Sequence, residues 1–137
     1  MDDLFKSMRI SSAGMKVQGA RMRVISENVA NADSMPTKPG ELPYRRKKIL
    51  FENELDKKLD VNIVHVKKIK EDSKENFKKF FDPAHPAADE NGYVLRPNVS
   101  SLIEMMDMRE AQRSYEANVN TIKASKKMLQ QTIDILR

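Results

Sequence analysis

The stretch 26-SENVANADS-34 closes a long apolar pattern and decides how the N-terminal part of the chain can fold. Asparagine is a poor helix former, yet Asn28 and Asn31 lie three residues apart and would project from nearby positions on one helix face. One interpretation is a helix stop, because asparagine tolerates the left-handed conformation at helix ends and Pro36 follows. The other is that the two amides form hydrogen bonds across a helix-helix contact and fix its register. The spacing alone leaves both interpretations open.

An apolar stripe leads from the N-terminus into this stretch at alternating steps of three and four residues. Eight of its ten positions are apolar when alanine is counted: Met1, Leu4, Met8, Ser11, Met15, Gln18, Met22, Ile25, Val29 and Ala32. No proline interrupts the stripe before Pro36, so the pattern predicts a helix over about residues 3–32. Gly14 and Gly19, with small neighbours, leave a slim flank that a second helix could approach closely.

The same spacing returns near the C-terminus. Again eight of ten positions are apolar: Met105, Met108, Gln112, Tyr115, Val119, Ile122, Lys126, Leu129, Ile133 and Leu136. Ser101 and Glu104 match a capping box, in which the serine hydroxyl and the glutamate carboxylate each accept a free backbone N–H. Pro97 stands just upstream, where a helix would not yet have begun. These features predict a second helix over about residues 101–136.

Between the helices the pattern changes to loops and short strands. Residues 36–43 contain three prolines and a glycine, which predicts a loop. Strands are predicted at residues 44–51 and 61–69, and Asn91-Gly92 is a turn signal before a further short strand. The lysine-rich residues 70–79 are predicted to form an exposed loop.

These elements predict an α+β fold. Long N- and C-terminal helices are expected to pack as a coiled-coil-like pair, with a small β-containing insert between them. The expected domains are residues 1–35 with the first helix and the asparagine pair, residues 36–97 with the loop and the β-rich middle, and residues 98–137 with the second helix. A chain of 137 residues has room for little more.

The charge raises the question of an anionic partner. The formal net charge is +5 and the pI is near 9.4, with the most basic run at 45-RRKK-48. Acidic and basic residues alternate along the middle of the chain, as on an ordinary solvated surface, and no nucleic-acid-binding motif accompanies the run. We therefore expect no nucleic-acid partner, and keep weak nucleic-acid binding as an alternative. No window approaches the roughly 20 apolar residues of a membrane span, and the N-terminus does not resemble a secretory signal.

Catalytic or metal-binding residues are sparse. The chain has no cysteine and two histidines, His65 and His85. Asp82, His85, Asp89 and Glu90 form a local cluster, but its spacing lacks a second histidine and favours a loop with internal hydrogen bonds. We expect no enzyme activity, no metal and no cofactor.

Both helices carry more apolar surface than one partner can cover. A second apolar set lies beside each stripe: Phe5, Ile10, Val17, Ala20 and Val24 in the first helix, and Leu102, Ile103, Met106, Ala117, Ala124 and Met128 in the second. The helices could bury their stripes on each other, but a two-helix hairpin covers only one face of each member. Nine methionines suit surfaces that adapt to several neighbours.

The terminal helices are therefore predicted to assemble with other chains. The predicted interface comprises Met8, Met15, Met22, Ile25, Asn28, Val29, Asn31, Met105, Met108, Tyr115, Asn118, Val119, Ile122, Leu129, Ile133 and Leu136. A coiled-coil adaptor that forms a discrete dimer has the same periodicity and is the alternative.

Four stretches carry a resemblance to a known family. Residues 26–34, 43-PYRRKK-48, 82-DPAHPAADENGYVLRPNV-99 and the helix stretch 104–119 resemble bacterial flagellar axial proteins, the rod and hook group, and within it the proximal-rod members. Met35-Pro36 departs from the small hydroxyl residues that are frequent there. The lysine-rich residues 67–79 match no motif.

The resemblance implies a structural subunit of the flagellar basal-body rod, the shaft that crosses the periplasm and transmits torque. Its implied partners are other flagellar rod proteins, copies of itself and the flagellar type III export apparatus. Export by that route implies passage without a cleaved signal peptide. Folding of the terminal helices on docking would fit such a subunit.

Overall fold

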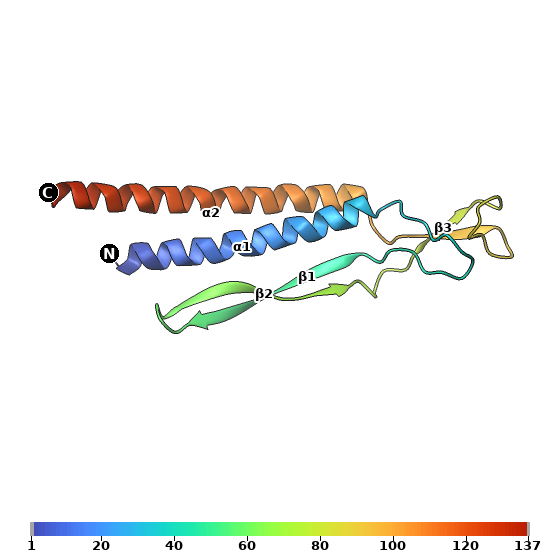
Figure 1. The fold of residues 1–137 in the computed structure, drawn as a ribbon, viewed down its shortest axis with the longest axis horizontal. Coiled ribbons are helices and arrows are strands. Elements are labelled where there is room, and N and C mark those ends of the chain that lie inside the picture. The colour runs from blue at the N-terminus through green and yellow to red at the C-terminus, as the bar shows by residue number, and fades with distance from the viewer. Residues whose placement is uncertain (1, 137) are drawn as a thin grey trace. The chain divides into compact units, whose positions relative to one another are not determined.

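A computed structural model describes residues 2–136 and confirms the α+β fold (Figure 1). The elements follow the order α1 (Asp2–Ala30), β1 (Lys47–Asp56), β2 (Val61–Glu71), β3 (Lys78–Phe81), β4 (Tyr93–Arg96) and α2 (Ser101–Ile135). The two terminal helices pack together, and the strands between them form two separate two-stranded sheets. No helix within residues 2–136 combines the length and the apolar content needed to cross a membrane.

Both predicted helices are confirmed within about two residues at each end. α1 ends where the Asn31 N–H donates to the Glu27 carbonyl and the Asn31 side-chain amide donates to the same oxygen at 2.8 Å. The Ser34 hydroxyl donates in turn to the Asn31 Oδ1 at 3.3 Å. Asn31 therefore acts locally, as a polar group that satisfies the end of its own helix.

The strands differ more from prediction. β2 begins at Val61 as expected, but β1 begins at Lys47, three residues later than predicted, after Arg46, whose N–H is bound by the Asn98 side chain. β3 begins at Lys78, within residues 70–79, which were predicted to be a loop, and continues to Phe81. Its two lysines give it the sequence pattern of a polar loop. β3 nevertheless pairs antiparallel with β4, from Lys78 opposite Arg96 to Phe81 opposite Tyr93.

The predicted turn before β4 is confirmed. Gly92 has a φ of +80°, and a Cβ at this position would lie 3.0 Å from the Pro83 Cγ. Glycine avoids both the strain and the contact.

The chain divides into two compact units that both draw on the helices. Unit 1 comprises residues 1–22, 49–68 and 108–137, and unit 2 comprises residues 23–48 and 69–107. Each is described separately below.

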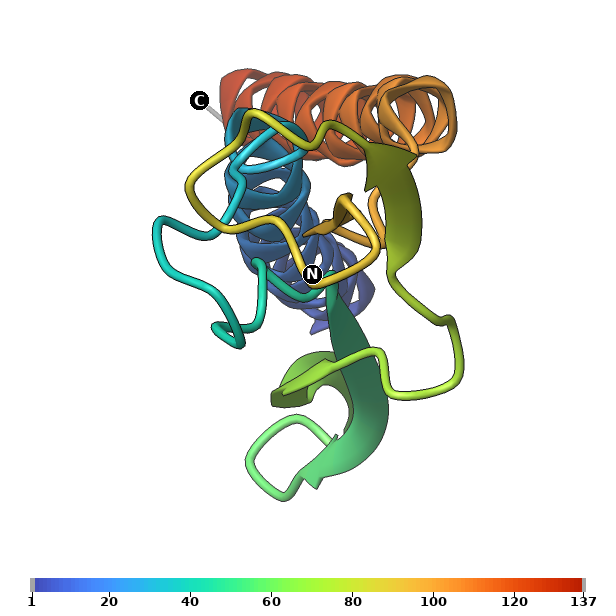
Figure 2. The same cartoon turned by 90° about the vertical axis from the view of Figure 1, so that its right-hand side faces the viewer.

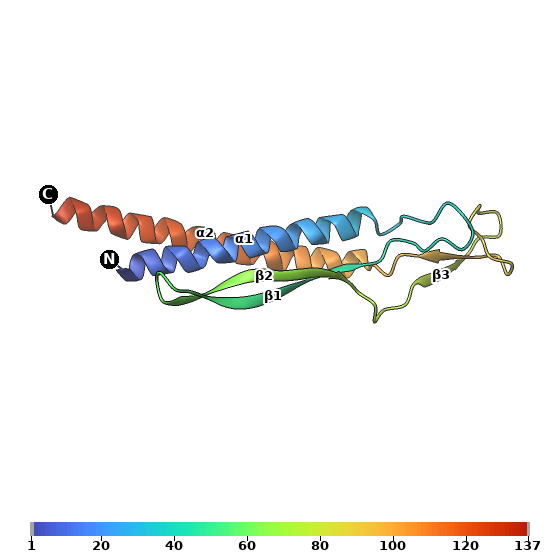
Figure 3. The same ribbon diagram turned by 60° about the horizontal axis from the view of Figure 1, so that its bottom comes forward.

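In unit 1, α1 lies between α2 and the β1-β2 hairpin (Figures 1, 2 and 3). An ion pair links α1 to the hairpin, in which the Arg9 Nε donates to the Asp56 Oδ2 at 2.9 Å. Arg21 of α1 reaches Glu110 of α2 at 3.3 Å. The interior holds small side chains, with Ser11, Val17, Ala111 and Ser125 all buried.

Unit 2 contains the end of α1, the start of α2 and the β3-β4 ribbon. Its apolar core consists of Val24, Ile25, Ala87, Val94 and Val99. Polar side chains are buried beside this core: Asn28, Asp72, Asn98 and Glu104. Buried polar groups require hydrogen-bonding partners, and each of these four side chains binds groups from other segments of unit 2.

Candidate assembly interface and polar junction

The fully buried side chains of α2 are small or polar, whereas the residues of the predicted apolar stripe are half-buried or exposed. Ala111, Ser125 and Glu104 are buried, whereas Met105 and Ile133 of the stripe are exposed. Met108, Tyr115, Ile122 and Leu129 of the stripe are half-buried and lie three or four residues from the buried positions, so they share the inward face with them. Other apolar side chains of α2 remain on the surface.

In unit 1, α1 carries a glycine where the Asn118 side chain of α2 packs against it. A Cβ added to Gly14 of α1 would lie only 2.8 Å from the Nδ2 and 3.0 Å from the Oδ1 of Asn118 in α2. The Asn118 amide is itself held by a 2.9 Å bond to the Ser114 carbonyl. The Asn118 side chain therefore lies close against the α1 backbone at this point, where glycine leaves room for the amide.

Much apolar surface remains exposed on the helices. Side chains of this kind on α1 and α2 are Phe5, Ile10, Leu102, Ile103, Met105, Met106, Met128, Ile133 and Ile135, and Leu136 follows α2. Within this set Leu102, Met105 and Met106 are neighbours at one-turn spacing near the start of α2. A contiguous exposed apolar surface of this type marks an interaction site.

A polar junction organises unit 2 around Asn28, whose side chain is 1% exposed. The Asn28 Oδ1 accepts from the Lys47 N–H at 2.9 Å and from the Tyr44 hydroxyl at 2.8 Å. The Asn28 Nδ2 donates to the Lys47 carbonyl at 2.9 Å and to the Glu104 Oε2 at 3.1 Å. The amide thus uses both donors and both acceptor sites, and joins α1, β1 and α2.

Glu104 is the second buried member of the junction, also 1% exposed. Its Oε1 accepts from the Arg46 Nε at 2.5 Å, and Arg46 also lies 3.5 Å from the Asp107 Oδ2. We expected Glu104 to close a capping box with Ser101, and this interpretation is wrong. The carboxylate turns inward because an arginine and an amide there compensate its burial.

The Asn98 side chain binds the backbone of Arg46. Its Oδ1 accepts from the Arg46 N–H at 2.7 Å, and its Nδ2 donates to the Asp72 and Glu75 carbonyls, both at 3.1 Å. The Asp72 N–H donates to the Arg46 carbonyl at 2.7 Å. Two asparagine amides, from Asn28 and Asn98, therefore bind the backbone of adjacent residues 46 and 47.

Two groups of the junction titrate abnormally. A hydrogen bond from Lys48 lowers the pKa of Asp72, against the opposing effect of burial. Burial raises the pKa of Tyr44 to about 12, and the negative charges of Glu27, Glu104 and Glu71 add to the effect. The lowered pKa favours the ionised Asp72 carboxylate, and the raised pKa favours the neutral Tyr44 phenol, so both shifts favour the forms present at neutral pH.

The basic run 45–48 is engaged within the chain. The Arg45 guanidinium lies 4.1 Å from the centre of the Phe77 ring and donates to the Asp72 carbonyl at 3.1 Å. Lys47 pairs with Glu27, and Lys48 pairs with Asp72. These partners give the run a structural role in unit 2.

The acidic cluster in residues 82–90 forms turns. The Asp82 Oδ1 accepts from the Ala84 N–H, and the His85 Nδ1 accepts from the Ala87 N–H at 3.1 Å. The Asp89 Oδ1 accepts from two backbone N–H groups, those of Asn91 and Tyr93. Within residues 2–136 no group of three or more His, Asp or Glu side chains is arranged to hold a metal ion.

The structure places the predicted interface residues in three environments. Ile25 and Asn28 are buried within the chain. Exposed residues are Met105, Ile133 and Leu136. The remainder are half-buried: Met8, Met15, Met22, Val29, Asn31, Met108, Tyr115, Asn118, Val119, Ile122 and Leu129.

Sequence reasoning missed most of the junction. Tyr44, Arg46, Asp72 and Asn98 lie far apart in the chain, and only their position in the fold brings them to Asn28 and Glu104. One available signal was the glutamate flanked by apolar residues at the start of α2, Glu104 between Ile103 and Met105. A lone charge among apolar neighbours on a helix is a candidate for a buried pair.

The sequence is similar to those of flagellar basal-body rod proteins. The sequence model of the family described as Flagellar basal body rod FlgEFG protein C-terminal matches residues 90–135, which include all of α2. Three relatives align along most of the chain, and each is described as flagellar basal-body rod protein FlgC.

The relative from Agrobacterium fabrum is 47% identical over 137 residues, covering 100% of this chain and 98% of its own. That from Bacillus subtilis is 37% identical over 146 residues, covering 96% and 97%. That from Salmonella typhimurium is 35% identical over 126 residues, covering 92% of both. Identity at this level along the whole length establishes the relationship, and the chain belongs to the FlgC family of flagellar basal-body rod proteins.

Proposed function

We propose that this structural rod subunit assembles through its terminal helices into the proximal part of a tubular shaft that transmits torque. The observation that carries the proposal is the apolar surface of α2 that is exposed to solvent in a single chain, including Leu102, Met105 and Met106. Burial of that surface between subunits would supply the favourable free energy of assembly.

In this proposal the terminal segments, residues 1–35 and 98–137, make the contacts with other rod proteins and with copies of the same chain. The middle segment, residues 36–97, carries the loops and strands that distinguish this chain from a simple pair of helices. Asn28 contributes indirectly, because its four hydrogen bonds hold α1 against β1 and α2. The subunit would reach the periplasm unfolded, through the flagellar type III export apparatus.

The test substitutes exposed methionines near the start of α2. A Met105→Ser/Met106→Ser variant should keep the helical circular dichroism of the parent chain, since both side chains are exposed. In cells that lack the native gene, it should fail to enter isolated basal bodies and fail to restore swimming. Gln112→Ser changes an exposed polar position of the same helix and should behave as the parent chain does.

Incorporation of the double variant at the parental level would contradict the proposal. A discrete dimer by light scattering, without incorporation of the parent chain into basal bodies, would favour the coiled-coil adaptor. Salt-dependent binding to DNA by fluorescence anisotropy would instead favour the nucleic-acid alternative.

A further inference from the structure

A groove in unit 1 has no assigned occupant. It lies between α1 and β2, has a volume of about 300 Å³, and is lined on its apolar part by Ala13, Val17, Ile63, Val64 and Val66. An apolar cavity of about 150 Å³ accommodates a benzene-sized group, so this groove has room for about two aliphatic side chains.

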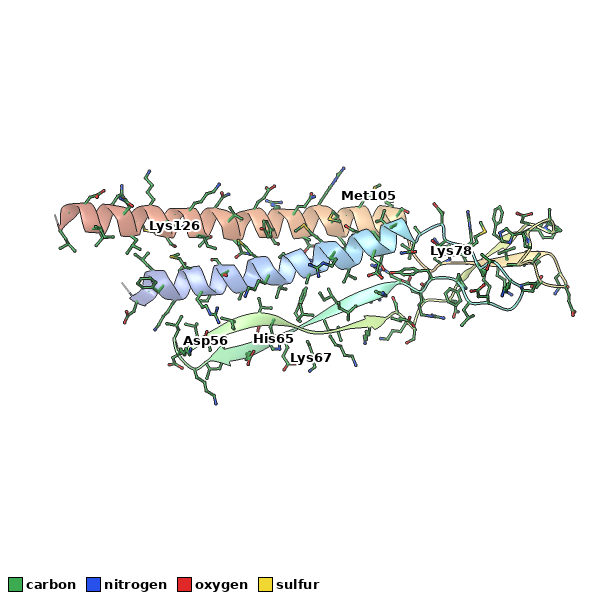
Figure 4. All side chains as sticks on the ribbon, in the orientation of Figure 1. Asp56, His65, Lys67, Lys78, Met105 and Lys126 are labelled. Atoms are coloured by element: carbon green, nitrogen blue, oxygen red, sulfur yellow. The ribbon has the colours of Figure 1, made fainter. Side chains whose placement is uncertain are left out.

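Cationic side chains border the apolar part. Arg9 and Lys16 both line the groove and both are exposed. Arg9 is bonded to Asp56 of the hairpin, whereas no ion pair engages Lys16 within residues 2–136. Figure 4 shows Asp56 and His65, which is also a lining residue, on the hairpin. The matching occupant therefore has aliphatic side chains beside a carboxylate.

The end of α2 has this chemistry. Ile133 is 50%, Ile135 84% and Leu136 77% exposed, and Asp134 lies among them. Ile133 and Leu136 are three residues apart and so project from nearby positions on one face. Figures 1 and 3 both show this end of α2 extending beyond the start of α1.

We propose that the last turn of α2 from a second copy of the chain occupies the groove between α1 and β2. Ile133 and Leu136 would fill the apolar part, and the Asp134 carboxylate would face the Lys16 ammonium. The chain's own α2 cannot supply this turn, because α1 separates α2 from the hairpin throughout unit 1 (Figures 1 and 2). The inference rests on the proposed assembly of the chain with copies of itself.

The geometry of such a contact suits an extended assembly. The groove and the end of α2 are different surfaces, so each copy donates one and accepts the other. A head-to-tail contact of this kind propagates into a helix when the rotation does not close a ring.

The N-terminal end of α1 is the competing occupant, because Asp2 and Asp3 precede the exposed Phe5. From residue 2 onward this end offers one large exposed apolar side chain, that of Phe5, whereas the end of α2 offers three. The experiment distinguishes the two.

Crosslinking provides a direct test, since the chain has no native cysteine. A Ser12→Cys/Leu136→Cys variant, expressed in cells that lack the native gene, should give covalent multimers of the chain after mild oxidation of isolated basal bodies. Ser26→Cys/Leu136→Cys places the first thiol at an exposed α1 position outside the groove and should give none. Phe5→Cys/Ser12→Cys should also give none, and multimers from that pair alone would assign the groove to α1 and overturn the inference.

Charge exchange provides an independent readout. Lys16→Glu and Asp134→Lys should each lower incorporation into basal bodies, roughly tenfold, and the combined variant should restore it. Normal incorporation of all three, with no crosslink between positions 12 and 136, would overturn the inference and leave the proposed function intact. Failure of the parent chain itself to enter basal bodies would overturn the proposed function, and the inference with it.

Discussion

The side-chain amide of Asn28 binds both the N–H and the carbonyl of Lys47, as a neighbouring strand would, at 2.9 Å each. A helix side chain thus fixes the first residue of β1 in unit 2. The remaining donor and acceptor of the same amide reach Glu104 and Tyr44, so that one residue connects four segments of the chain.

Replacement of Asn28 should destabilise the fold strongly. Asn28→Ala would leave the Lys47 backbone groups, the Tyr44 hydroxyl and the Glu104 carboxylate short of partners, and we expect a loss of about 3 kcal/mol in the free energy of unfolding. Urea denaturation of the purified chain, followed by circular dichroism, measures it. Asn31→Ala is the control, because Asn31 bonds only its own helix end, and it should cost less than about 1 kcal/mol. Similar losses for both variants would refute the role assigned to Asn28.

The two glycines of α1 should respond in opposite ways to alanine. Gly19→Ala should stabilise the chain by about 0.5–1 kcal/mol, because a Cβ there meets nothing within 4 Å and alanine favours the helix. Gly14→Ala should destabilise it, because the new Cβ displaces the Asn118 amide from its bond to Ser114. Thermal unfolding of the two variants gives the comparison.

A second substitution checks the cause of that difference. Asn118→Ala in the Gly14→Ala background should recover most of the loss, since the displaced amide is then absent. If Gly14→Ala proves as stabilising as Gly19→Ala, then the Asn118 amide does not restrict the side chain at position 14.

Acid should weaken the junction through Asp72. Its pKa in the folded chain is lowered, chiefly by the hydrogen bond from Lys48, below the unfolded value of about 3.9. The resulting stabilisation is fully present above that unfolded value and is lost as the pH falls through the lower folded pKa. The urea midpoint should therefore fall below about pH 4, and less steeply in Asp72→Asn. An identical acid limb in both chains would contradict this assignment.

Alkali should act through Tyr44, whose folded pKa of about 12 exceeds the unfolded value of about 10. The neutral phenol is favoured in the folded chain, so its contribution is complete below about pH 10 and is lost as the pH rises through 12. Ultraviolet titration should show a tyrosine component that ionises near pH 12, and Tyr44→Phe should remove that component. Tyr44→Phe should also cost about 1 kcal/mol at neutral pH, through the lost bond to Asn28.

The sequence by itself determined the two helices, the start of β2 and the turn at Gly92. Helix periodicity is a local property that repeats every few residues, and Pro36 and Pro97 mark helix limits whatever the surroundings. The second apolar set of α2 was also predicted from the sequence, because the apolar positions that lie outside the first stripe can be counted directly.

Only the tertiary structure decided which face of α2 points inward. The sequence of α2 carries apolar positions on more than one face, and in the fold the small or polar Glu104, Ala111 and Ser125 are fully buried between half-buried members of the predicted stripe. β3 likewise depends on its partner, since two lysines give it no strand pattern until it pairs with β4. The roles of Arg46 and Glu104 were hidden for the same physical reason: a charge is buried only where distant segments converge to compensate it, and local sequence does not record that convergence.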